Sequence, residues 1–90
     1  MKEIQPTTQY RKDLKRYRNK PKKLAALANI LQLLANEQPI PKQYLPHMLT
    51  GRYKGCMEWH IEGDFLLIWI DEQRNIIELV RLGSHSELFG

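Results

Sequence analysis

The sequence predicts an α+β domain with the element order β-α-α-β-β-β, in which a two-helix hairpin packs on an antiparallel sheet. Apolar residues recur at helical spacing in the first third of the chain, and three strand-like segments follow one another in the last third. The chain has 90 residues, of which 42% are hydrophobic. We therefore expect a single domain over residues 1–90 with a small core.

The first half of the chain is expected to form one strand and two helices. The stretch "MKEIQ" reads as an edge strand. In "PTTQYRKDLKRYRNK", Thr7 or Thr8 is a natural N-cap, and Tyr10, Leu14 and Tyr17 form one apolar stripe. The proline of "NKP" ends this helix and can begin the next, which the leucine-rich "PKKLAALANILQLLANEQ" predicts.

A long irregular segment precedes three strands. "EQPIPKQYLPHMLTGRYKG" contains three prolines and two glycines, and loops of this length in a compact domain are usually functional or disordered. We favour a functional loop because it carries aromatic, basic and histidine side chains. "CMEWHI" alternates like a strand, "FLLIWI" is apolar on both faces like a central strand, and "IIELVRL" is the third strand. Turns are expected at Gly63 and at "DEQRN".

Positive charge gathers at the start of the chain. Residues 1–23 hold nine basic and two acidic side chains, whereas the remainder holds five basic and eight acidic ones. A basic block on one element is typical of a protein that binds a polyanion. DNA, RNA and an acidic protein explain the block equally well, and a solvated helix face is the simpler alternative.

The sequence also argues against a membrane protein, a secreted protein, a disulfide-linked protein and a metal site. No apolar run approaches the length of a membrane span, and the N-terminus lacks the apolar segment of a signal peptide, so we expect a soluble cytoplasmic protein without a membrane partner. The single cysteine excludes an internal disulfide. The three histidines lack the close spacing of metal sites, so the sequence predicts no metal and no cofactor.

Six side chains are candidates for chemistry: His47, His60, Asp64, Arg81, His85 and Phe89. Each has a structural explanation when taken alone. His60, on the strand face that carries Glu58, could be solvent-exposed; Asp64 suits a turn; and Arg81 could keep an edge strand soluble. Whether the strand ends converge is not fixed by the sequence.

Taken together, these side chains suit metal-free RNA cleavage. Histidine can remove the 2′-hydroxyl proton or protonate the 5′-oxygen near neutral pH. Arginine can stabilise the phosphorane charge, and an aromatic ring such as that of Phe89 can support a base by stacking.

The sequence resembles the YafQ branch of the RelE/ParE superfamily of bacterial type II toxins. The resemblance covers nearly the whole chain and rests on "GRYKG", "WHIEGD" and the terminal "RLGSHSELFG". It implies the compact RelE-like fold. It also implies a metal-independent, ribosome-dependent endoribonuclease that cuts mRNA in the A site and is neutralised by a cognate antitoxin.

The resemblance also implies that the six candidates line the active site and that basic side chains meet ribosomal RNA. The expected RNA- and ribosome-binding residues are Arg11, Lys12, Lys15, Arg16, Arg18, Lys22, Lys23 and Lys54. We favour His85 as the acid and His60 or His47 as the base, with Asp64 orienting a histidine or acting as the base itself. A ParE-like inhibitor of DNA gyrase and a non-catalytic nucleic-acid-binding module are the alternatives.

Overall fold

The computed structural model describes residues 1–72 and 75–90, so part of the predicted "DEQRN" turn lies outside the described residues. The elements in chain order are β1 (Glu3–Pro6), α1 (Thr8–Lys15), α2 (Pro21–Ala35), β2 (His47–Met48), β3 (Met57–Glu62), β4 (Phe65–Glu72), β5 (Ile76–Gly83) and α3 (His85–Phe89). Two 3₁₀ turns, Lys42–Tyr44 and Gly51–Tyr53, flank β2. The predicted α+β class is confirmed.

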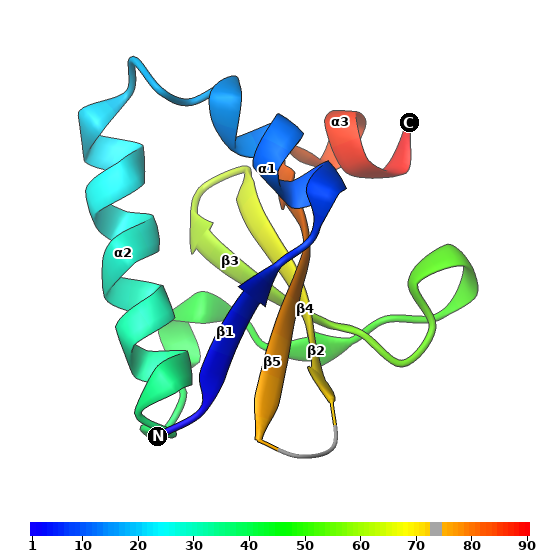
Figure 1. The fold of residues 1–90 in the computed structure, drawn as a ribbon. Coiled ribbons are helices and arrows are strands. Elements are labelled where there is room, and N and C mark those ends of the chain that lie inside the picture. Colours follow the sequence, from blue (N-terminus) through cyan, green and yellow to red (C-terminus); the bar gives the residue numbers. More distant parts are fainter. Residues whose placement is uncertain (73–74) are drawn as a thin grey trace.

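The five strands form one mixed sheet in the order β1-β5-β4-β3-β2 (Figure 1). The predicted edge position of the first strand is confirmed. The expectation of a fully antiparallel sheet is wrong at that edge, because β1 runs parallel to β5 whereas the other neighbours are antiparallel. A parallel pair needs a long crossover, and both helices and three strands separate β1 from β5 in the chain.

Two short elements were not predicted. The segment expected to be an irregular loop contains β2 between its two 3₁₀ turns, and the last strand is followed by α3. An element of two to five residues is too short to give a detectable period. Within the described residues, no helix combines the length and apolar character that a membrane span requires.

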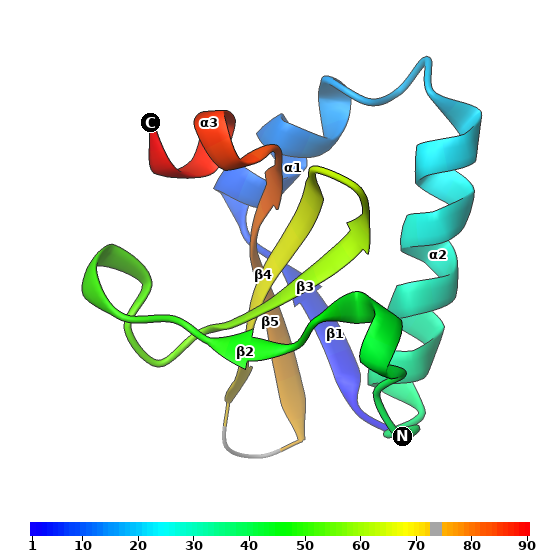
Figure 2. The ribbon, with the colours of Figure 1, turned by 180° about the vertical axis from the view of Figure 1, so that it is seen from behind.

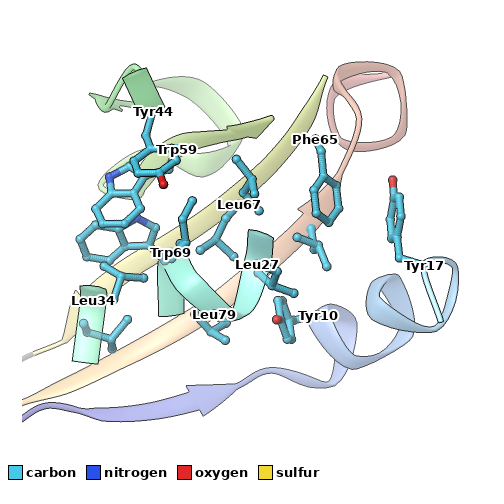
Figure 3. Close-up of a cluster of buried hydrophobic side chains, with 14 residues drawn as sticks. Tyr10, Tyr17, Leu27, Leu34, Tyr44, Trp59, Phe65, Leu67, Trp69 and Leu79 are labelled. Carbon is cyan, nitrogen blue, oxygen red and sulfur yellow. The ribbon is translucent and has the colours of Figure 1, made fainter. Parts of the chain in front are cut away.

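Apolar residues cover both faces of the sheet. On the face beneath α2, Trp59, Leu67 and Leu79 pack with Leu27 and Leu34, as Figure 3 shows. A smaller cluster fills the opposite face; its buried members are Tyr53, Cys56, Leu66, Ile68 and Leu88. The prediction that "FLLIWI" is covered on both sides is therefore confirmed. The candidate site lies on this second face.

Candidate active site

Three histidines and a phenylalanine from distant parts of the chain come together in a row. Adjacent ring centroids lie 6.0 Å apart for His47 and His60, 5.6 Å for His60 and His85, and 5.8 Å for His85 and Phe89. The rings come from β2, β3 and α3, whose positions can be followed in Figure 2. The antiparallel register brings His47 opposite Glu58, and His60 stands two residues further along β3. The convergence that the sequence left open is thus present.

Glu58 lies beneath two of these rings. One of its oxygens, Oε1, is 3.0 Å from Nε2 of His47 and 3.1 Å from Nε2 of His60. The residue is only 2% exposed. A buried carboxylate is costly unless polar partners compensate for the lost water, and the two imidazoles provide that compensation. Glu58 therefore connects the two rings through one carboxylate oxygen.

Asp64 holds His85. Its Oδ1 accepts hydrogen bonds from the backbone N–H of His85 at 2.9 Å and from Nδ1 of the ring at 2.8 Å. These two bonds, the backbone one first, lower the pKa of Asp64 below its usual value. An ionised carboxylate only accepts hydrogen bonds, so Nδ1 of His85 carries its hydrogen and Nε2 is directed elsewhere. Asp64 thereby fixes the orientation and tautomer of this ring.

The short helix α3 is anchored at its start. Ser84 and Glu87 form a reciprocal capping box, and Glu87 also accepts a hydrogen bond from the Tyr17 hydroxyl. The Tyr17 bond is the largest cause of a lowered Glu87 pKa. A side chain at Gly83 would place its Cβ 2.7 Å from Oε1 of Glu87, and the φ angle of +154° there also favours glycine. These contacts position His85 and Phe89, which α3 carries.

Arg81 is tied to the scaffold through its guanidinium. Its Nε and one terminal nitrogen donate to the two oxygens of Asp13 at 2.8 and 3.2 Å, and the other terminal nitrogen donates to the Tyr53 hydroxyl at 3.0 Å. The pair with Asp13 raises the pKa of Arg81 further. Tyr53 in turn donates to the carbonyl of Leu88, and its ring meets Phe89 edge-on at 5.6 Å. Arg81 is therefore connected to α3 through Tyr53.

The basic side chains divide into two groups. Seven of the eight predicted RNA- and ribosome-binding residues are exposed, and Lys23 is half-buried. Six have no ion-pair partner among the described contacts: Arg11, Lys12, Lys15, Arg18, Lys22 and Lys54. The other two have carboxylate partners, because Arg16 lies 3.5 Å from Glu87 of α3 and Lys23 lies 3.2 Å from Glu62. The Arg16 contact joins the basic region to the helix that carries His85.

The structure brings five of the six predicted site residues into one cluster, and the sixth, Arg81, is connected to it through Tyr53. Sequence reasoning missed Asp13, Glu58 and Tyr53. Strand alternation put Glu58 on the His60 face, which was the available signal, but did not reveal its burial. Asp13 stood out as an acidic residue within a basic helix, whereas nothing local marked Tyr53.

Comparisons with known proteins agree with this geometry. Residues 2–90 match the family described as bacterial toxin of type II toxin–antitoxin system, YafQ. The mRNA interferase toxin YafQ of Escherichia coli strain K12 is 33% identical over 90 residues, covering 99% of this chain and 97% of the relative.

Solved structures also resemble the chain over its length. A metal-bound toxin from Helicobacter pylori is 40% identical, with a TM-score of 0.89 over 99% of this chain and 100% of the other. A DinJ–YafQ complex from Escherichia coli contains a chain that is 31% identical, with a TM-score of 0.86 over 100% of both. The chain therefore belongs to the YafQ family of bacterial toxins of type II toxin–antitoxin systems.

Proposed function

We propose that this protein is a toxin endoribonuclease that cleaves mRNA in the ribosomal A site by metal-independent acid–base catalysis. The observation that carries this proposal is the row of His47, His60, His85 and Phe89, backed by two carboxylates. Imidazoles are the side chains best suited to moving protons near neutral pH. The name mRNA interferase, given to the Escherichia coli relative, supports the same substrate class.

The proposed reaction moves one proton onto the protein and one off it. His60 or His47 takes the proton of a ribose 2′-hydroxyl, and that oxygen attacks the adjacent phosphorus. Glu58 stabilises the imidazolium that forms. The bond from phosphorus to the 5′-oxygen breaks as protonated His85, oriented by Asp64, donates a proton to the leaving oxygen. The products are a 2′,3′-cyclic phosphate and a 5′-hydroxyl.

Arg81 and Phe89 assist this reaction. A guanidinium has five N–H donors, and three of them are used in the described part of the chain. The remaining two are available to the phosphorane oxygens, where developing negative charge needs a donor. Phe89 is 43% exposed at the end of the row and can stack on a base beside the cleaved bond.

Binding to the ribosome is assigned to the exposed basic side chains of α1 and its surroundings. Figures 1 and 2 agree that α1 lies beside α3, so rRNA bound there would be next to the proposed catalytic row. Phosphate contacts are salt-sensitive. Reversing the charge of Arg11 and Lys15 is expected to weaken ribosome pelleting, whereas reversing exposed Lys42, in the first 3₁₀ turn, serves as the matched control.

We also assign this toxin a cognate antitoxin, by analogy with the DinJ–YafQ complexes of Escherichia coli. The test is co-purification of the tagged toxin with the product of an adjacent small reading frame. Recovery of the toxin alone, with both products expressed, would remove this partner from the proposal.

The decisive experiment adds purified protein to ribosomes programmed with a defined mRNA and maps cleavage by primer extension. The expected result is A-site cleavage that needs ribosomes and survives chelation of transition metals while magnesium is held constant. One Helicobacter pylori relative was crystallised with a metal, so metal requirement and metal binding are measured separately. Intact mRNA together with inhibited DNA supercoiling would favour the gyrase alternative.

A further inference from the structure

Two imidazoles and a carboxylate form a compact set of metal ligands within the candidate site. The ligand atoms of His47, Glu58 and His60 all lie within 4.8 Å of one another. Two of the separations, from Oε1 of Glu58 to each Nε2, are 3.0 and 3.1 Å. Ligands on a tetrahedral zinc ion, with bonds of about 2.0–2.1 Å, are separated by about 3.3 Å. Only small side-chain adjustments would therefore admit an ion between them.

The surroundings of His47 orient it as a metal ligand. Its Nδ1 lies 3.1 Å from the carbonyl oxygen of Leu45. A carbonyl only accepts, so the hydrogen is on Nδ1 and the lone pair of the neutral ring is on Nε2, facing Glu58. A backbone carbonyl on the second ring nitrogen is a common way to fix a histidine that binds metal.

The backbone holds the other two ligands in place and leaves the site accessible. Glu58 lies opposite His47 in the β2–β3 register, and His60 projects from the same face of β3. The His47 side chain is 51% exposed, whereas Glu58 is buried. An ion could therefore reach the cluster from solvent and keep a further coordination position open.

The ligand atoms, two imidazole nitrogens and one carboxylate oxygen, decide which class of ion fits this cluster. Nitrogen ligands favour zinc and copper, whereas magnesium prefers an all-oxygen shell. The set therefore discriminates against the magnesium of the ribosome.

We propose that His47, Glu58 and His60 bind a divalent transition-metal ion of the zinc or copper class, and that the bound ion inhibits the toxin. The inhibitory part rests on the proposed function. The ion takes the nitrogen lone pairs that would otherwise accept the 2′-hydroxyl proton, and it covers the carboxylate that stabilises the resulting charge. It acts as a reversible block rather than as a cofactor.

Binding is tested on the full chain without any activity measurement. Metal-free protein is titrated with Co²⁺, followed by visible absorption, and with Zn²⁺, followed by calorimetry. We expect one ion per chain and a loss of affinity of about 100-fold or more in His47→Ala and His60→Ala, because losing a ligand exceeds the 10–100-fold typical of losing its outer partner. His85→Ala, a histidine of the same row outside the ligand set, is the matched control and keeps the affinity.

Glu58→Gln keeps the shape of the buried side chain and should also lower the affinity for the ion. Thermal melting confirms that this variant is folded. Wild-type affinity in both His47→Ala and His60→Ala, or loss of affinity in His85→Ala alone, would place the ion elsewhere and overturn the site.

Inhibition is measured on programmed ribosomes with magnesium fixed. Stoichiometric Zn²⁺ should suppress cleavage at least about 10-fold, and a chelator selective for transition metals should restore it. Binding at the three ligands with unchanged cleavage would overturn the inhibitory role. If the metal-free protein cleaves nothing, the proposed function and the inhibition built on it both fail, and the Co²⁺ spectrum still decides the metal site.

Discussion

Asp13 and Asp64 both hold a basic side chain of the candidate site, but in opposite surroundings. Asp13 is fully buried, and its two oxygens accept hydrogen bonds from Arg81, from the backbone N–H of Leu82 and from Gln9. The Asp64 side chain is 61% exposed and binds the backbone and ring of His85. The first pair is part of the packed scaffold, whereas the second can open without exposing the core.

The pKa shifts of the two carboxylates have the same direction and different origins. Burial by itself raises the pKa of Asp13, but hydrogen bonds from Arg81, Leu82 and Gln9 outweigh burial and hold the pKa below its usual value. The pKa of Asp64 is lowered chiefly by the backbone N–H of His85 and then by its ring. A lowered pKa therefore marks a buried scaffold carboxylate in one place and an exposed carboxylate of the proposed active site in the other.

The largest effect is expected at the exposed pair of Asp64 and His85, and it concerns the rate of cleavage. His85→Ala should reduce single-turnover cleavage on programmed ribosomes by about 10²–10⁴-fold, because the leaving oxygen loses its proton donor. The melting temperature should change little, since the His85 side chain is 55% exposed. The matched control is Ser86→Ala, the next exposed position of α3. A folded His85→Ala protein that cleaves at the control rate would make His85 a spectator.

Changing the buried pair of Asp13 and Arg81 should instead lower the free energy of unfolding. Asp13→Asn removes the charge from a side chain that is enclosed beside Arg81. Breaking a buried ion pair by changing one partner typically costs about 3–5 kcal/mol in unfolding free energy. Urea denaturation measures this loss, and Arg11→Ala, at an exposed position of α1, should change stability by less than about 0.5 kcal/mol. A loss below about 1 kcal/mol for Asp13→Asn would show that the pair is not a major stabilising contact.

Asp64→Ala should separate orientation from stability at the exposed pair. Freed from the carboxylate, the His85 ring no longer has a fixed orientation, and misplacement of a reacting group by about 1 Å can cost about 10²-fold in rate. We expect cleavage to fall about 10–100-fold, whereas the midpoint of urea unfolding should change little because the Asp64 side chain is 61% exposed. Asp64→Asn, which keeps an acceptor oxygen, should retain more activity than Asp64→Ala. Equal rates in the two variants would argue against a hydrogen-bonding role for the oxygen.

The contrast between these regions also explains what the sequence could predict. The long periodic segments predicted the two long helices and the three long strands, and the resemblance pointed to the residues of the cluster. Asp13 was hidden because its partner Arg81 is 68 residues away, and only the tertiary structure brings a helix residue against that strand. Glu58 was placed on the correct face, but its partner His47 comes from a two-residue strand that has no recognisable period.

The partners of Arg81 could not be predicted from the sequence either. The resemblance assigned it to phosphate, and the spacing of "LVRLG" could not reveal that Asp13 and Tyr53 already occupy part of its guanidinium. The histidines are too far apart in the sequence to predict a metal site, but spacing along the chain does not reveal which residues are neighbours in space. Cross-strand pairing brought His47 and Glu58 together despite their separation in sequence.

The smallest expected effect is on the pH dependence of stability under acidic conditions. Because the folded-state pKa of Asp13 is lowered, its ionised form stabilises the fold at pH values above the unfolded pKa of about 3.9, and this contribution disappears as the pH falls through the lower folded value. Asparagine does not titrate, so the stability gap between the wild type and Asp13→Asn should narrow below about pH 4.

Urea denaturation between pH 3 and pH 7 measures that gap. Asp64 has the same sign of shift, but exposure and salt screening weaken its contribution, so Asp64→Asn should follow the wild-type curve closely throughout. A gap that stays constant for Asp13→Asn down to pH 3 would mean that its cost comes from packing rather than from the lost charge. Convergence confined to Asp64→Asn would reverse the assignment and make the exposed carboxylate the acid-sensitive support of the fold.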